Sequence, residues 1–229
     1  MVMSRRGAGV GWGSPLDDEI HKLVEMVTEL GIEVEDILFN AVTALLGEGI
    51  HGAQKAPEAG RECEVRYQLA HQRGLDLILD ERATPDQTRW IIELQEINRS
   101  FRRIAQHAVR IATQSLALQQ PAEDVLVLVG GSMHLLEYVV EQTRIQLRNA
   151  IMFSTSRDRK FARRIRNDES ELRRAYIVFE TRMHDGISAY PYLSFPMHQL
   201  LSISTRLVQI GGHCNEIANA VLYDPPSQH

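Results

Sequence analysis

The sequence contains one apolar pattern twice, and this repeat constrains the fold more than any other feature. Apolar residues recur at alternating steps of three and four from Pro85 to Ala112, and the segment from Pro191 to Ala218 repeats these steps 106 residues later. The two sets are Leu94, Ile97, Phe101, Ile104, Ala108 and Ile111, and Leu200, Ile203, Leu207, Ile210, Cys214 and Ile217. Such spacing keeps a narrow apolar stripe on one side of a helix, as in packed bundles. The repeat therefore predicts two equivalent helices in an all-α protein.

The repeat extends beyond the two stripes. His107 and His213 occupy equivalent places beside them, and so do Ala112 and Ala218. Upstream, the same offset relates Leu30, Val34, Glu35 and Ala44 to Leu136, Val140, Glu141 and Ala150. We therefore expect the chain to be an internal duplication whose unit covers most of each half.

Amphipathic patterns predict three long helices in each half. The first half has helices from Asp17 to Gly47, from Arg61 to Leu79, and from Pro85 to about Ala117, with Pro57 and Gly60 delaying the second. In the second half a helix carries Val129 to Ala150, a fifth closes at Asp185-Gly186, and a sixth stops at Asp224-Pro225-Pro226. Short connections make neighbouring helices antiparallel, so the sequence predicts two tandem three-helix bundles.

The expected organisation has four parts. Residues 1–16 have no apolar period, and glycines alternate with other residues from Gly7 to Gly13, which indicates a flexible arm. The first bundle then covers residues 17–118 and the second covers 122–224, with Pro121 at the junction and a tail at 225–229.

Charge and composition narrow the function classes. A formal net charge of −5 argues against indiscriminate nucleic-acid binding. The two cysteines, Cys63 and Cys214, provide no disulfide framework, which favours a reduced compartment. No apolar run approaches the roughly 18 residues of a membrane span, and no apolar stretch follows Arg5 and Arg6 as in a secretory signal. These features predict a soluble, cytoplasmic protein.

The repeated helices carry a specific resemblance. The second copy reads Leu207-Val208-Gln209-Ile210-Gly211-Gly212-His213-Cys214, then Glu216-Ile217-Ala218. The first copy reads Phe101-Arg102-Arg103-Ile104-Ala105-Gln106-His107-Ala108, then Arg110-Ile111-Ala112. This pattern resembles the third helix of each domain in the PhoU family of phosphate-uptake regulators, and the resemblance covers Asp17 to Tyr223. It agrees with the duplicated three-helix architecture.

The resemblance also shows where this chain departs from the family. Members with this frame carry acidic residues four apart on each third helix, where carboxylates one turn apart can hold a cation. The corresponding positions here are Arg102, Gln106, Val208 and Gly212. None of these side chains is an anionic ligand, so we expect a divergent member with no metal site of the family type, no other cofactor and no catalytic residues.

The function that the resemblance implies is regulation without catalysis. It implies accessory control of phosphate import through contacts with the ATPase of a phosphate ABC transporter and with a sensor histidine kinase. Uptake and phosphate-starvation signalling through the two-component system would both be damped. The resemblance further implies association with the membrane only through these partners. Homodimerisation is expected because elongated bundles leave apolar stripes that a twofold partner can cover.

One basic cluster is the candidate contact surface for a partner. It straddles the turn into the fifth predicted helix and consists of Arg157, Arg159, Lys160, Arg163, Arg164 and Arg166. Such a cluster can meet an acidic protein surface, anionic lipid or nucleic acid. The alternative is a solvated face whose field is diluted by Asp158, Asp168, Glu169 and Glu171.

Other functions remain as alternatives. Glu62, Glu64, Asp168, Glu169 and Glu171 could serve a metal-binding or metal-storing bundle, although solvated acids are the better interpretation. A di-iron bundle enzyme would need paired Glu-x-x-His elements, and the chain offers only Glu48-x-x-His51, in a glycine-rich turn. Asp18-x-x-His21 lies at a predicted helix start and has no partner of the same form. His107 and His213 suggest a ligand or proton-transfer role, but histidines beside a stripe are more often structural. A PhoU-like module could also regulate a different transporter or a nucleic-acid complex.

Overall fold

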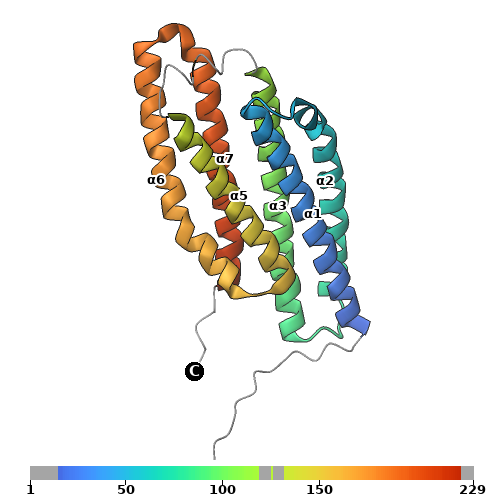
Figure 1. The fold of residues 1–229 in the computed structure, drawn as a ribbon. Coiled ribbons are helices and arrows are strands. Elements are labelled where there is room, and N and C mark those ends of the chain that lie inside the picture. Colours follow the sequence, from blue (N-terminus) through green and yellow to red (C-terminus); the bar gives the residue numbers. More distant parts are fainter. Residues whose placement is uncertain (1–14, 119–124, 126–131, 223–229) are drawn as a thin grey trace, which may run out of the picture.

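The computed structural model describes residues 15–118, 125 and 132–222, and these residues form long helices without any strand. The first half contains α1 (Pro15–Leu45), α2 (Ile50–Ile78) and α3 (Pro85–Ala117). The second half contains α5 (Ser132–Ser156), α6 (Arg159–Ala189) and α7 (Ser194–Leu222), with the short 3-10 helix η1 (Pro191–Leu193) before α7 (Figure 1). The predicted all-α class is confirmed. The expected junction at Pro121, the tail at 225–229 and all but the end of the arm lie outside the described residues.

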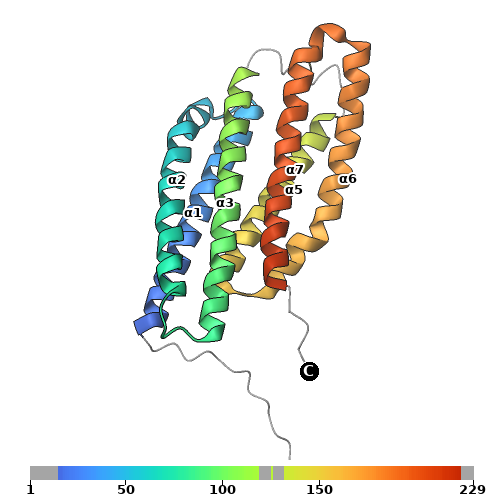
Figure 2. The ribbon, with the colours of Figure 1, turned by 180° about the vertical axis from the view of Figure 1, so that it is seen from behind.

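Each half forms its own three-helix bundle, and the two bundles lie side by side. Helices α1, α2 and α3 all contact one another, and so do α5, α6 and α7. Between the bundles, α3 packs on α7 and α1 packs on α5, while α2 and α6 occupy the outer edges (Figures 1 and 2). The chain runs in opposite directions along α3 and α7, and likewise along α1 and α5. The predicted pair of three-helix bundles is therefore present.

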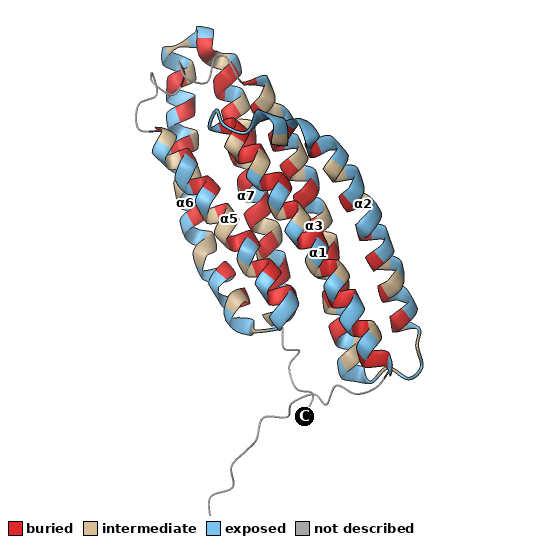
Figure 3. Ribbon diagram, turned by 45° about the vertical axis from the view of Figure 1, so that its right-hand side comes forward, coloured by how far each residue is buried: buried red, intermediate tan, exposed pale blue. Residues whose placement is uncertain are grey.

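Both repeated stripes are buried. All twelve residues of the two sets named above are at most 1% exposed. Burial of a leucine, isoleucine or phenylalanine side chain contributes about 1.5–3 kcal/mol, so the stripes are a large part of what holds each bundle together. The buried residues of both halves join into one hydrophobic core that runs between the bundles (Figure 3).

Local sequence signals explain several helix ends. At the start of α3, the Thr84 hydroxyl accepts from the Gln87 N–H, and the Gln87 side chain accepts from the Thr84 N–H, which satisfies two exposed backbone donors. Gly47 and Gly49 follow α1 with φ of 86° and 68°, a region that glycine enters without steric cost. Asp158 caps α6 by accepting from the Lys160 N–H at 2.9 Å.

Two predicted boundaries were wrong because glycine and proline were interpreted as helix breakers. Helix α2 begins at Ile50 and contains Pro57 and Gly60 in its interior. A Cβ atom at Gly60 would lie 2.6 Å from Val109 Cγ2, so this glycine allows α2 and α3 to approach closely. In the same way α6 continues past Asp185-Gly186 to Ala189, because Gly186 is buried in the packing and its carbonyl accepts from the Tyr190 N–H at 2.8 Å.

None of the helices in the described part of the chain is long and apolar enough to cross a membrane.

Shortening Ile104 or Ile210 to alanine should lower the stability of the whole chain. Both side chains are fully buried at equivalent positions of the repeat, and such truncations typically cost about 2–5 kcal/mol of unfolding free energy. Because the two halves share one core, we expect the protein to unfold in a single cooperative transition. Either substitution should move this transition to a lower urea concentration, as measured by circular dichroism.

The matched control is Val65→Ala on the exposed side of α2, which should change the unfolding free energy by less than about 0.5 kcal/mol. Two separate transitions, each shifted by only one of the isoleucine variants, would contradict a shared core.

Candidate functional site

The two equivalent histidines meet at the contact between the bundles. The ring centroids of His107 on α3 and His213 on α7 lie 5.5 Å apart, with the planes inclined by 26°. Because these residues are equivalent in the repeat and their helices are antiparallel, the pair marks the approximate twofold axis that relates the two halves. Around it, Arg103 Nη1 lies 3.4 Å from Glu216 Oε2, and Gln114 Nε2 donates to the Ser202 hydroxyl at 2.8 Å. The two copies of the repeat therefore contact each other through α3 and α7.

Burial keeps His107 uncharged. Burial is the largest cause that lowers the pKa of His107, and with the nearby His213, Arg206 and Arg110 it brings this pKa to about 4. The Nδ1 atom of His107 is buried without a hydrogen-bond partner, whereas Nδ1 of His213 lies 3.0 Å from Glu216 Oε2. An uncharged His107 stacked on His213 is suited to close packing of α3 on α7, which agrees with a structural role for both residues.

A polar cavity of about 470 Å³ opens beside this pair. Its lining includes both histidines, Glu169 and Arg173 of α6, and Val208 and Gly212 of α7. The last two residues occupy the positions where the family resemblance implies carboxylates. The structure therefore places these two positions at the wall of a cavity, next to the contact between the bundles.

In the first bundle a guanidinium group occupies the corresponding place. Arg102 Nε donates to Glu64 Oε2 at 2.7 Å across the α2–α3 interface, and Arg102 Cζ lies 4.6 Å from the ring centroid of Tyr67. The hydrogen bond from Arg102 lowers the pKa of Glu64, so this carboxylate stays ionised and paired. An internal cation thus already neutralises the acid that a metal would need, and Gln106 offers no charge to replace it.

The second bundle lacks anionic ligands at its two motif positions. A Cβ atom built at Gly212 would have no heavy atom within 4 Å, and Val208 is apolar. The remaining acid, Glu169, already accepts from Asn215 Nδ2 and pairs with Arg173 at 3.1 Å. Within residues 15–118, 125 and 132–222, no three His, Cys, Asp or Glu side chains form a group that could hold a metal ion. The residues present do not fit a metal centre of the family type.

The acids of the metal-storing alternative are likewise dispersed or already engaged. Glu62 is exposed on α2, and Asp168 and Glu171 are on α6, where Glu171 accepts from the Tyr138 hydroxyl at 3.3 Å. His51 lies in the first turn of α2 and contacts Gln54, whereas Glu48 lies in the loop before it.

The predicted basic cluster divides into two parts. Arg157 has φ of 53° at the end of α5, and its guanidinium carbon lies 4.0 Å from the Trp90 ring centroid. Arg159, Arg163 and Arg166 are spaced by four and three residues, so they share one exposed side of α6. Lys160 and Arg164 lie near the ring of Phe161, and Lys160 also pairs with Asp158 at 2.8 Å.

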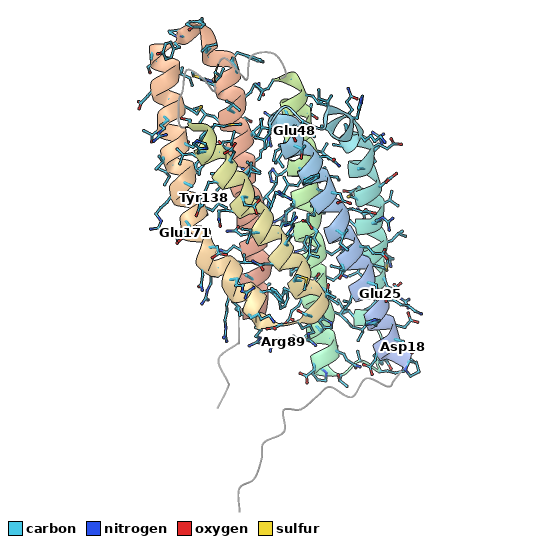
Figure 4. The ribbon with its side chains drawn as sticks, in the orientation of Figure 1. Asp18, Glu25, Glu48, Arg89, Tyr138 and Glu171 are labelled. Atoms are coloured by element: carbon cyan, nitrogen blue, oxygen red, sulfur yellow. The ribbon has the colours of Figure 1, made fainter. Side chains whose placement is uncertain are left out.

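Arg157 therefore belongs to a different environment from the other five residues. Burial lowers its pKa, while Glu93 and Asp86 act in the opposite direction. Together with Trp90, Asp17 and His21 it lines a cavity of about 370 Å³ at the end of the molecule where α1 begins; Figure 4 shows Asp18 of the same cavity and Arg89 at this end. Nothing in the local sequence indicated the Arg157–Trp90 contact, because it joins segments distant in the chain.

The comparisons with known proteins identify the fold as PhoU-like. The chain matches the crystal structure of PhoU from Pseudomonas aeruginosa with a TM-score of 0.82, over 91% of this chain and 97% of that chain. The two sequences are 17% identical, so the likeness shows the fold alone. No protein-family model matches the sequence, and no curated protein matches it significantly.

Acid should destabilise the protein through His107. Its pKa is about 4 in the folded chain instead of the usual 6.5, so between these values the unfolded chain takes up a proton that the folded chain cannot hold. The unfolding free energy should therefore fall as the pH drops from 6.5 towards 4. We expect His107→Gln to reduce the difference between the unfolding free energies at about pH 7 and about pH 5. Both free energies are measured by unfolding in urea.

His51→Gln, at an exposed position on α2, is the control and should keep the full pH dependence. The explanation would be wrong if His107→Gln and the original protein lost the same stability on acidification.

Metal ions should leave the stability of the protein unchanged. Adding Zn²⁺, Mn²⁺ or Fe²⁺, or a chelator, should move the melting temperature by less than about 1 °C, because a ligand raises it only by binding the native state. Val208→Glu combined with Gly212→Asp places two carboxylates one turn apart at the cavity. The melting temperature of this variant should rise when one of these metal ions is added. Stoichiometric metal in the purified protein, lost together with stability on chelation, would refute this interpretation.

Proposed function

We propose that this chain regulates phosphate homeostasis as a non-enzymatic, PhoU-like adaptor protein. The observation that carries the proposal is the structural likeness to PhoU, which extends over 91% of this chain and nearly the whole of the other. The resemblance of the repeated helices, from Phe101 and from Leu207 onwards, points to the same family. The proposal places the protein in the cytoplasm, where it acts on other proteins and not on a small substrate.

The lack of reactivity in the obvious nucleophiles supports a role without catalysis. Both cysteines are buried and free. Burial raises the pKa of Cys63 to about 12 and raises that of Cys214 as well, so neither is a thiolate at neutral pH. The histidine pair is stacked at a helix contact, and the hydrogen-bond partner of His213 there is the carboxylate of Glu216 and not a hydroxyl nucleophile. The described groups therefore resemble a packed scaffold more than a catalytic centre.

The proposed partners are the ATPase of a phosphate ABC transporter and a sensor histidine kinase. Binding to them would damp phosphate uptake and phosphate-starvation signalling, and would bring the protein to the membrane only through its partners. Long helix faces are suited to this kind of docking, in which a few anchors supply affinity and charge steers the approach. We assign the steering to the basic side of α6 formed by Arg159, Arg163 and Arg166, all of which are exposed.

Deletion of the gene is the first test of this function. In phosphate-rich medium the deletion should raise both phosphate uptake and the output of a phosphate-starvation reporter, and the original gene should restore both. Affinity purification from the same phosphate-replete cells should recover the transporter ATPase. Unchanged uptake, with no phosphate-transporter subunit recovered, would overturn the assignment, and recovery of another transporter would favour the alternative role there.

Charge reversal on α6 tests the proposed surface. The triple variant Arg159→Glu, Arg163→Glu and Arg166→Glu should lower recovery of the ATPase about tenfold, which corresponds to a loss of roughly 1.4 kcal/mol in binding. Arg61→Glu combined with Arg182→Glu, at exposed positions elsewhere, should bind normally. Equal recovery with both variants would remove the basic side of α6 from the interface.

A further inference from the structure

The cavity of about 370 Å³ at the end of the molecule where α1 begins is built by helices of both bundles. Its walls come from the start of α1, from Trp90 on α3 and from the residues at the end of α5. Figure 4 shows Asp18, one of the lining residues, at this end of the molecule. Sites for small molecules occur preferentially where domains meet, and their volumes usually lie between about 300 and 1,000 Å³. The position and the size of the cavity are therefore those of a binding site.

Contacts between distant segments hold the walls of the cavity in place. The Gln87 Nε2 atom donates to Asp17 Oδ1 at 2.6 Å, which connects the start of α3 to α1. The Trp90 and Phe153 rings pack edge to face, with their centroids 6.4 Å apart and their planes at 84°, which connects α3 to α5. The cavity is therefore preformed, so a ligand loses little free energy in ordering its walls.

Two side chains of opposite charge line this cavity without pairing. Asp18 of α1 and Arg157 at the end of α5 are both exposed. In the described part of the chain, neither of them makes an ion pair or a side-chain hydrogen bond. Glu93 and Asp86 act on the charge of Arg157 only from a greater distance. The cavity thus offers one negative and one positive group to a molecule that bridges them.

The backbone of Arg157 indicates that its side chain has a role. Among the described residues other than glycine, only Arg157 has a positive φ, of 53°. Glycine or asparagine adopts this left-handed conformation at a lower cost, so the turn between α5 and α6 does not itself require arginine. Non-glycine residues in such conformations cluster at binding sites. An acid in the first turn of a helix, such as Asp18, has a structural explanation in the helix dipole, whereas Arg157 has none of this kind.

Trp90 supplies an apolar wall and an unused hydrogen-bond donor. Its side chain is 2% exposed, and its Nε1 atom is buried without a hydrogen-bond partner among the described residues. A buried donor in this state is rare, because leaving it unpaired costs free energy. The guanidinium carbon of Arg157 lies over the ring, 4.0 Å from its centroid, so a turn of this exposed side chain towards a ligand would uncover the indole. The buried side chain of Val24 extends the apolar wall.

We propose that this cavity binds an α-amino acid with an apolar side chain. The ammonium group of the ligand faces Asp18, its carboxylate faces Arg157, and its side chain lies against the wall formed by Trp90 and Val24. Charge-assisted hydrogen bonds at both ends of the ligand are stronger than those between neutral groups. Asp17 and Asp18 would repel a simple anion, and Arg157 would repel a simple amine. A molecule that carries both charges therefore fits better than either.

Calorimetry with L-leucine and two analogues that carry a single charge tests the class of ligand. L-Leucine should bind the full chain with a dissociation constant below about 1 mM. Isocaproate lacks the ammonium group of leucine and isoamylamine lacks its carboxylate, so each should bind at least about tenfold more weakly. The proposal would be overturned if leucine did not bind, or if either analogue bound as tightly as leucine.

The fluorescence of Trp90 tests the place of binding. The chain has one other tryptophan, so Trp12→Phe leaves Trp90 as its single indole. Leucine does not absorb where indole absorbs, and it should change the Trp90 emission with the same dissociation constant as in calorimetry. Heat of binding with an unchanged Trp90 emission would place the ligand elsewhere and contradict the assignment of this cavity.

Removal of either charge should weaken the binding of leucine. Arg157→Asn introduces a residue that tolerates the left-handed backbone, and Asp18→Asn keeps the shape of its side chain. Each variant should raise the dissociation constant at least about tenfold. Both positions are exposed, so circular dichroism should show that both variants remain folded.

The matched controls are Arg61→Asn on α2 and Glu25→Gln on α1, at exposed positions outside the cavity. Both controls should bind leucine as the original protein does. An effect of only one of the two cavity charges, or an equal effect of the controls, would show that the site does not recognise a ligand with both charges. None of these results depends on phosphate regulation, so this site and the proposed function can fail separately.

Discussion

The antiparallel packing of α3 on α7 is the constraint on which the rest of the structure depends. Each of these helices buries its stripe within its own bundle, and each also contacts the other across the bundles. This shared contact joins two three-helix units into one hydrophobic core. It also brings His107 and His213 into a stack at the twofold axis of the repeat, where two positive charges would repel each other.

In the first bundle a positively charged side chain of the protein itself neutralises a carboxylate beside the third helix. Arg102 holds Glu64 across the α2–α3 interface and stacks over Tyr67, so the local charge is balanced within the protein. In the second bundle the equivalent positions, Val208 and Gly212, face a cavity instead. The duplicated frame is thus maintained by apolar packing, while the positions beside it have diverged in different ways in the two halves.

Sequence patterns located the helices better than their ends. The capping box at Thr84 is visible in the sequence because its partners are three residues apart. Gly60 lies inside α2 because Val109 approaches it closely, and Gly186 lies inside α6 because it is buried in the helix packing. Rules based on the local sequence therefore misplaced the start of α2 and the end of α6. Similarly, charge spacing identified the basic side of α6, but Arg157 leaves that side to stack on Trp90.

The sequence by itself determined the helical class, the duplication and the side of each repeated helix that is buried. These follow from the spacing of apolar residues, because residues three and four apart in the sequence lie on the same side of a helix. Only the tertiary structure decided which faces meet: α3 with α7, α1 with α5, and Arg102 with Glu64. It also left Ile32, Phe39 and Leu46 of α1 exposed, although these residues are as apolar as those of the core. Pairing of this kind depends on packing between segments far apart in the chain, and the period of a single helix carries no information about its neighbours.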